Sequence, residues 1–386
     1  MAKYRLGDIA PVCQGMVADS NQCWLLNLDV VESNTGKILE YVYVDHSQIG
    51  ASTVSFDKMN VLYSKLRPYL NKVVLPDRAG YATSEMLPLR PNEQVITREY
   101  LTYFLRSPHF VKYINGKTSG AKMPRANIAD LKAVEIECPS IMEQNRITTQ
   151  FDLITRVIEK RQKELSTFDN LIKARFVEMF GDPELNPMEW PVEALGDVLS
   201  VEPQNGLYKP QSDYVQDGTG IPILRIDAFY DGKVTDFSGL KRLNCTDAER
   251  SRYLLMENDI VINRVNSLEY LGKCAWITGL LELTVFESNM MRFHVEESRI
   301  DPCYMTRLLC STYIYKQILN RAKKAVNQAS INQGDVQSFK ILVPPVGLQK
   351  QYAAFVAQVD KSKAQVQKAL DETQLLFDSL MQEYFG

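Results

Sequence analysis

Two segments of the sequence contain Lys and Arg but no Asp or Glu. One lies between Glu99 and Asp130, and the other lies between Asp301 and Asp335. Clustered Lys and Arg attract the phosphates of nucleic acid, and Arg, Lys, Asn and Gln can bind base edges in the major groove. We therefore predict that both segments bind DNA, through Lys117, Lys122, Arg125 and Asn127 in the first, and Arg321, Lys323, Lys324, Asn327 and Asn332 in the second.

A further basic patch precedes each of these segments. Lys65 and Arg67 have counterparts in Arg264 and Asn266, and we predict that these four residues bind DNA as well. Each acid-free segment ends in a polar stretch, 119–127 or 326–332, that we expect to form a loop. The net charge of −3 weighs against nucleic-acid binding, and a single basic run is most simply a solvated surface. Because the pattern occurs at two matched places, DNA binding is favoured.

The sequence lacks the residue patterns of an enzyme active site. The three histidines are isolated, the seven cysteines include no CxxC pair, and no adenine methyltransferase motif occurs. The glycine-rich run 116–122 does not have Walker A spacing. We expect no catalytic, cofactor-binding or metal-binding residues. The scattered cysteines and the absence of a long apolar run favour a cytoplasmic protein.

These features belong to an internal repeat. The segment LGDI at 6–9 returns as LGDV at 195–198, and the same order of matches continues along the chain, with 60–65 echoed by 259–264, 100–114 by 304–318 and 126–139 by 331–345. Each copy begins with a mixed part in which short β-like runs alternate with helical patterns such as 100–114 and 304–319. The repeat indicates two domains built on one plan.

A long helix is predicted at the end of each copy. Residues 142–180 contain no Gly or Pro, and apolar residues recur every three or four positions, with Arg161 in the one gap. A similar apolar seam, interrupted twice, runs through 348–384. Two such helices in one chain are most simply explained by an antiparallel coiled coil. The alternative is that each helix packs on its own domain.

The predicted fold class is α+β, with two pseudo-repeated globular α/β domains separated by two long helices that form an antiparallel coiled coil. The expected boundaries are 1–141 for the first globular domain, 142–181 for the first long helix, 182–190 for a linker, 191–346 for the second globular domain and 347–386 for the second long helix.

This plan resembles the specificity subunits of type I restriction–modification enzymes. The most specific likeness is Leu171–Pro183 (LIKARFVEMFGDP), which is close to a conserved region of that family. Each copy also opens with the L-G-D-[IV] sequence and closes with a strand and proline, at Cys138-Pro139 and Pro344-Pro345. The resemblance covers essentially the whole chain. Recognition domains vary within the family, so no base contact carries over by position.

The resemblance implies a non-catalytic subunit whose two target-recognition domains each read one half of a bipartite, asymmetric DNA site. The helices would set the spacing and dock two adenine methyltransferase subunits, which bring S-adenosylmethionine to a flipped adenine. Restriction subunits that use ATP and Mg would join this core. Helices of about 38 residues would extend ~57 Å and hold the domains roughly 10–13 base pairs apart. The alternative is a stand-alone DNA-binding or scaffold protein of another defence system.

Overall fold

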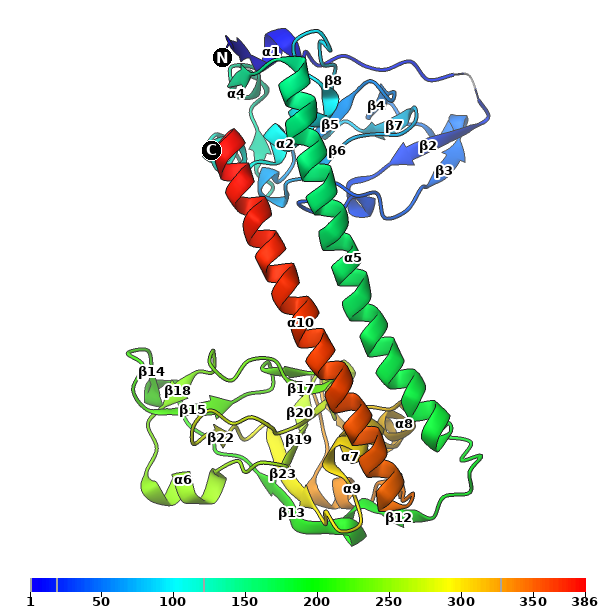
Figure 1. The fold of residues 1–386 in the computed structure, drawn as a ribbon, viewed down its shortest axis with the longest axis vertical. Helices are drawn as coiled ribbons and strands as arrows, with labels where there is room; N and C mark the ends of the chain where they lie inside the picture. The colour runs from blue at the N-terminus through cyan, green and yellow to red at the C-terminus, as the bar shows by residue number, and fades with distance from the viewer. Residues whose placement is uncertain (1, 19, 121, 327) are drawn as a thin grey trace. The chain divides into compact units, whose positions relative to one another are not determined.

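The structure, a computed structural model, describes residues 2–18, 20–120, 122–326 and 328–386. Its contacts divide the chain into two compact units, residues 1–164 with 366–386 and residues 165–365. Each unit contains one globular domain together with parts of the two longest helices, α5 (Ile141–Phe180) and α10 (Val346–Phe385) (Figure 1). None of the helices in the described ranges has a stretch apolar enough to cross a membrane.

The first globular domain is built from short strands and short helices. Its helices are α1 (Leu6–Ile9), α2 (Arg98–Arg106), α3 (Pro108–Asn115) and α4 (Ile128–Lys132). Its strands are β1 (Ala2–Arg5), β2 (Gln22–Leu26), β3 (Tyr43–Asp45), β4 (Thr53–Phe56), β5 (Val61–Ser64), β6 (Val73–Val74), β7 (Gly80–Thr83), β8 (Met86–Leu89), β9 (Thr118–Ser119), β10 (Arg125–Ala126) and β11 (Glu135–Cys138). The strand orders are β3-β2-β7-β4, β6-β5-β8, β1-β11 and β10-β9.

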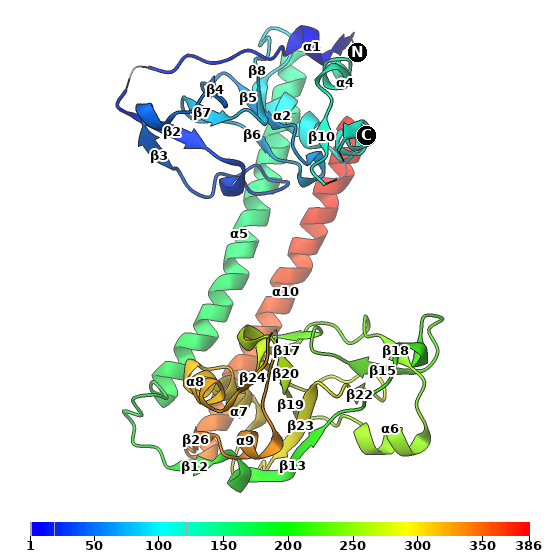
Figure 2. The ribbon, with the colours of Figure 1, turned by 180° about the vertical axis from the view of Figure 1, so that it is seen from behind.

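The second globular domain has larger sheets and the same kinds of element (Figure 2). Its helices are α6 (Asp247–Tyr253), α7 (Pro302–Leu309), α8 (Thr312–Arg321) and α9 (Gln333–Gln337). Its strands are β12 (Val192–Ala194), β13 (Leu199–Asn205), β14 (Tyr214–Val215), β15 (Ile221–Leu224), β16 (Phe229–Tyr230), β17 (Gly232–Val234), β18 (Arg242–Leu243), β19 (Ile260–Asn263), β20 (Val265–Asn266), β21 (Cys274–Trp276), β22 (Val285–Phe286), β23 (Met290–Val295), β24 (Lys323–Lys324), β25 (Ala329–Ser330) and β26 (Lys340–Leu342). The strand orders are β13-β23-β19-β21-β17-β16, β14-β18-β15-β22, β20-β25-β24 and β12-β26.

The internal repeat is visible in the register of the central strands. In the first domain β5 lies between β8 and β6, and in the second β19 lies between β23 and β21. Ser64, the last residue of β5, pairs with Met86, just as Asn263, the last residue of β19, pairs with Met290. The predicted fold class, two copies of one α+β plan with long helices, is confirmed.

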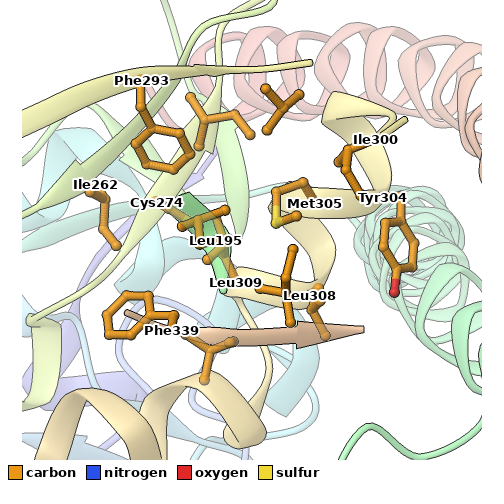
Figure 3. Close-up of a cluster of buried hydrophobic side chains, with 14 of the residues drawn as sticks. Leu195, Ile262, Cys274, Phe293, Ile300, Tyr304, Met305, Leu308, Leu309 and Phe339 are labelled. Carbon is orange, nitrogen blue, oxygen red and sulfur yellow. The ribbon is translucent and has the colours of Figure 1, made fainter. Parts of the chain in front are cut away.

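The repeated L-G-D sequence has a packing role in both copies. Leu6 and Leu195 are buried in the cores of their units. A Cβ added to Gly7 would lie 2.9 Å from the Cβ of Lys132 at the end of α4, so the chain approaches this helix too closely for a side chain. Figure 3 shows Leu195 within the apolar cluster that joins β19 and β23 to α7.

The helical patterns at 100–114 and 304–319 each form two helices rather than one. In the first domain, Ser107 ends α2 and caps α3 by accepting the Phe110 N–H at 3.2 Å. Ser311 caps α8 in the same way through the Ile314 N–H. In both copies a serine divides the periodic stretch because it caps a new helix. In the first copy the serine is followed by Pro108, which has no N–H to donate and so favours a helix start.

Each unit contains antiparallel packing between parts of α5 and α10. In the first unit, the ring of Phe151 lies 5.3 Å from the ring of Phe377. In the same unit Arg161, which fills the gap in the apolar seam, donates hydrogen bonds to the Ala369 carbonyl and the Thr373 hydroxyl. In the second unit, the ring of Phe176 on α5 lies 5.6 Å from the ring of Tyr352 on α10. The coiled-coil prediction is confirmed within each unit.

The C-terminal end of each long helix packs on the globular domain of the other copy. The ring of Phe180, at the end of α5, lies 4.7 Å from Tyr304 of the second domain. The ring of Phe385, at the end of α10, lies 5.0 Å from Tyr100 of the first domain. The alternative, in which each helix packs only on its own domain, is therefore wrong.

Candidate nucleic-acid interface

The structure brings the two separated basic stretches of the first domain together. Strands β9 and β10 form a small hairpin instead of the expected loop. This hairpin docks on the segment after β5, because the Ala126 N–H donates to the Lys65 carbonyl at 2.8 Å and the Arg67 N–H donates to the Pro124 carbonyl at 2.7 Å. We call the hairpin and this segment the first basic site, with Lys65, Arg67, Lys117, Lys122, Arg125 and Asn127 as its predicted DNA-binding residues.

Arg125 has a defined orientation within the first basic site. Its Nε and Nη2 atoms donate to Glu85 Oε1 at 3.0 and 2.9 Å. The hydrogen bonds with this carboxylate raise the pKa of Arg125. Glu85 was not singled out by sequence, and it lies 40 residues from its partner. The contact fixes the direction of a cation that would otherwise be free to swing.

The remaining residues of the first basic site differ in their surroundings. Arg67 and Lys122 are exposed, and Arg67 has a left-handed backbone conformation with φ of 48°. The Nζ atom of exposed Lys117 lies 4.0 Å from a carboxylate oxygen of Asp130, which is half-buried. Asn127 caps α4 by accepting the Ala129 N–H at 2.8 Å. Its side-chain oxygen therefore has a structural role, and its contact with DNA stays a prediction.

The second domain has the same arrangement at the matched place. Strand β25 pairs with both β24 and β20, and the Ile331 N–H donates to the Arg264 carbonyl at 3.0 Å. We call this the second basic site, with Arg264, Asn266, Arg321, Lys323, Lys324 and Asn332 as its predicted residues. Asn327, also predicted, lies outside the described residues. Lys323 and Lys324 are exposed on β24.

Three predicted residues of the second basic site make structural hydrogen bonds. Arg321 Nε donates to the Ser338 hydroxyl at 2.9 Å. Arg264 Nη1 donates to the Ser288 carbonyl at 3.1 Å, and Asn332 caps α9 by accepting the Asp335 N–H at 3.0 Å. These side chains hold the site together, so the exposed lysines of β24 are its freest cations among the predicted residues that the structure describes.

Two lysines that follow the basic patches in sequence donate hydrogen bonds to backbone carbonyls. Lys72 Nζ donates to the Leu28 carbonyl at 2.6 Å, and Lys273 Nζ donates to the Ile226 carbonyl at 2.9 Å. These bonds occupy matched places in the two copies. Each lysine ties the start of a strand that flanks the central strand, β6 or β21, to another segment of its domain, which explains its presence in both copies without a nucleic-acid contact.

One histidine has polar partners that its sequence surroundings did not indicate. The ring nitrogens of His294 lie 3.1 Å from Asp259 Oδ1 and 3.1 Å from Glu297 Oε1. Asp259 is buried and also accepts from Arg292, so these contacts form a polar network. Across the described part of the chain, no group of three or more His, Cys, Asp or Glu side chains has the geometry of a metal site.

Comparison with known families identifies the repeated plan. The family model described as the type I restriction modification DNA specificity domain matches twice, at residues 1–167 and 187–373. The chain belongs to this family. The two matches begin near the two L-G-D sequences, so the repeat seen in the residues is a repeat of the specificity domain.

Several similar proteins are described as specificity subunits of type I restriction enzymes. The chain is 22% identical over 378 residues to the MjaIX specificity subunit of Methanocaldococcus jannaschii, an alignment that covers 89% of this chain and 82% of that protein. It is 24% identical over 314 residues to the EcoKI specificity subunit of Escherichia coli, covering 77% of this chain and 66% of the other. It is 32% identical over 203 residues to a protein of Methanocaldococcus jannaschii described as the specificity subunit of the type I restriction enzyme MjaX. That alignment covers 52% of this chain and 46% of the relative.

Solved structures support the specificity-domain fold. The type I restriction–modification S subunit from M. genitalium aligns with a TM-score of 0.61 at 15% identity, covering 100% of this chain and 96% of that one. A chain from a structural study of complex assembly and conformational transition in a type I restriction–modification system gives 0.60 at 18% identity, covering 100% and 97%. At such identities the likeness shows the fold alone.

Sequence reasoning missed a buried glutamine in each specificity domain. Gln144 and Gln349 are both fully buried near the start of a long helix. Each lies five residues after a proline, Pro139 or Pro344, at the end of the matched repeat segments. The signal was therefore present in the repeat, but polar residues near a helix start usually face solvent. For Glu85 the sequence contains no comparable signal.

Proposed function

We propose that this chain is the DNA specificity subunit of a type I restriction–modification complex and catalyses no reaction itself. Each globular domain would read one half of a bipartite, asymmetric target through its basic site. The observation that carries the proposal is the matched docking of a basic hairpin on the segment after the central strand, in two domains of one chain. A common function in both copies explains this better than two unrelated solvated surfaces.

The long helices support a role in partner docking. Several apolar side chains lie outside the seam and are about half exposed or more, namely Leu153, Val157, Leu375 and Leu376 in the first unit and Leu171 and Val177 in the second. Leu153 and Val157 lie four residues apart on one helix and Leu375 is next to Leu376, so these side chains form small apolar groups, and contiguous exposed apolar surface marks protein interfaces. We propose that two adenine methyltransferase subunits bind here and supply S-adenosylmethionine. Restriction subunits, with ATP and Mg, would complete a cytoplasmic complex.

The alternative of a stand-alone DNA-binding or scaffold protein is not favoured. Such a protein would bind DNA without methyltransferase partners. The specificity-domain matches at 1–167 and 187–373 and the exposed apolar residues of the helices both support a chain that works in a complex.

The test is to map methylated adenines in a host that carries the chain and its methyltransferase. We expect a bipartite motif that disappears when the chain is deleted, and co-purification of two methyltransferase subunits per chain. Without them the chain should be poorly soluble. A monodisperse chain that does not bind its methyltransferase, or methylation independent of the chain, would contradict the proposal.

A matched pair of variants tests the basic sites. Replacing both exposed lysines of β24, Lys323→Gln and Lys324→Gln, should weaken DNA binding by the complex and lower the slope of log affinity against log salt by about two. The control variant, Lys350→Gln with Lys361→Gln, removes the same charge from exposed positions of α10. It should leave DNA affinity near the wild-type value.

A further inference from the structure

The two basic sites differ at one pair of equivalent positions. In the first site, the Lys65 N–H donates to the Glu85 carbonyl, and Leu66 forms a bridge with Arg125. In the second site, the Arg264 N–H donates to the Asn289 carbonyl, and Val265 pairs with Ser330. By these backbone contacts, Glu85 corresponds to Asn289 and Arg125 corresponds to Ser330. The same framework thus carries an ion pair in one domain and two small neutral polar residues in the other.

The Glu85 contact uses only one edge of the Arg125 guanidinium. Glu85 Oε1 accepts from Nε and Nη2, at 3.0 and 2.9 Å. On the other edge, Nη1 makes only a long contact of 3.4 Å to the Met123 carbonyl. A guanidinium has five N–H groups, so the edge formed by Nη1 and Nη2 keeps donors for a further acceptor. The Arg125 side chain is 44% exposed, whereas Glu85 is 21% exposed beneath it.

Guanine is the base that this arrangement suits. Its O6 and N7 atoms are two acceptors side by side in the major groove, and the fork of an arginine matches them with two parallel hydrogen bonds. An arginine already held by a carboxylate loses less rotamer freedom when it binds, because its direction is set in advance. A phosphate contact needs no such orientation, because a flexible lysine side chain can make it.

We propose that Arg125, oriented by Glu85, reads a guanine in the half-site bound by the first domain, and that Asn289 and Ser330 mark the equivalent reading position of the second domain. This inference rests on the proposed function. Glu85 is a positioning residue, because it acts on DNA only through the direction it gives Arg125.

The experiment uses the reconstituted complex of the chain with its methyltransferase subunits. Its affinity is measured for a panel of duplexes in which each base pair of both half-sites is substituted in turn. For Arg125→Ala we expect discrimination to fall about 10- to 100-fold at one G·C pair of the first half-site. Discrimination at the second half-site should be unchanged, which shows that the variant folds and assembles.

Three further variants separate base reading from charge. Glu85→Gln should lower discrimination at the same base pair while leaving the salt slope of nonspecific binding unchanged. Arg125→Lys keeps the charge but not the fork, so it should resemble Arg125→Ala in discrimination. Lys122→Ala, in the same hairpin, should weaken binding to every duplex alike and lower the salt slope by about one.

A transplant tests the equivalence of the two sites. Asn289→Glu combined with Ser330→Arg should create a preference for guanine at one position of the second half-site. The inference is overturned if Arg125→Ala leaves every base preference unaltered, or if it lowers the affinity for all duplexes equally, as Lys122→Ala is expected to do. If the wild-type complex itself shows no preference in either half-site, the proposed function fails instead.

Discussion

Gln349, in the first turn of α10, accepts a hydrogen bond at 2.8 Å from the backbone N–H of Asp301, the residue that caps α7. Its amide nitrogen also donates to the carbonyls of Arg299 and Pro344. Gln144 of α5 makes the same three bonds in the other copy. A fully buried amide thus fixes where each long helix leaves its globular domain.

Removing the Gln349 amide should destabilise the second unit. Gln349→Ala leaves one backbone N–H and two carbonyls buried without this partner, so we expect a loss of about 3 kcal/mol in the free energy of unfolding. Urea denaturation would measure this loss, and segment-resolved hydrogen exchange would show whether it lies in the second unit. The control, Gln351→Ala, changes an exposed neighbour and should stay within about 0.5 kcal/mol of wild type. Equal effects from the two variants would show that the buried amide is not an anchor.

Glu287 should make the stability of the second domain depend on pH. Burial raises the pKa of its carboxyl group, although it accepts the Ile226 N–H at 2.7 Å. An acid whose pKa is higher in the folded state loses stability as pH rises from the unfolded pKa through the folded one. Glu287→Gln keeps an acceptor and removes the charge, so it should be more stable than wild type at pH 7. The difference should shrink as the pH falls through the raised folded pKa toward the unfolded value near 4.5, and denaturation curves at several pH values would show it.

The matched control for this pH effect is Glu202→Gln, which changes an exposed carboxylate of the same domain. The difference in the free energy of unfolding between this variant and the wild type should not change with pH in this way. If Glu287→Gln is less stable than wild type at pH 7, the contact with Arg225, 3.9 Å away, outweighs the burial of the charge.

Cys310 should be the most reactive cysteine of the second domain. Its Sγ lies 3.4 Å from Sγ of Cys274, which is buried, whereas Cys310 is exposed. The hydrogen bond with Cys274 lowers the pKa of Cys310, and a larger thiolate fraction speeds alkylation at neutral pH. Mass spectrometry after brief iodoacetamide treatment should show several-fold faster labelling of Cys310 than of exposed Cys13. Cys274→Ala should remove this advantage; equal rates in the wild-type chain would disprove the activation.

The first globular domain should be an exchangeable unit of specificity. Replacing residues 1–141 with the equivalent part of another family member should change one half of the methylated motif. Because Phe385 packs on Tyr100, the graft must preserve this aromatic contact or exchange the end of α10 with it. Methylome sequencing gives the result. A change in both halves of the motif would contradict the assignment of one half-site to one domain.

The paired helices should determine the spacing of the two half-sites. Inserting seven residues near Lys163 and seven near Lys363 keeps the apolar seams in register and adds ~10 Å, about three base pairs of B-DNA. We expect the half-sites to move apart by about two to four base pairs, or activity to be lost because the DNA rotates between them. Insertion in α5 alone makes the two helices unequal in length, so it should abolish activity. Full methylation of the original motif by the paired variant would mean that the helices do not measure distance.

Local patterns in the sequence were sufficient for the architecture. The repeated L-G-D sequences, the runs without Gly or Pro and the three- or four-residue apolar spacing depend on neighbours along the chain. The long helices consequently lie at Ile141–Phe180 and Val346–Phe385, close to where periodicity places them. The acid-free segments could be located in the same way, because composition needs no knowledge of contacts.

Only the tertiary structure decided which side chains meet. The docking of β10 on the segment after β5, the pairing of Glu85 with Arg125, and the packing of Phe180 and Phe385 each join residues that are distant in the sequence. Such contacts depend on strand register and on how helices cross, which periodicity in one sequence does not encode. The caps formed by Asn127 and Asn332 show the same limit, because an asparagine that could read a base is equally suited to end a helix.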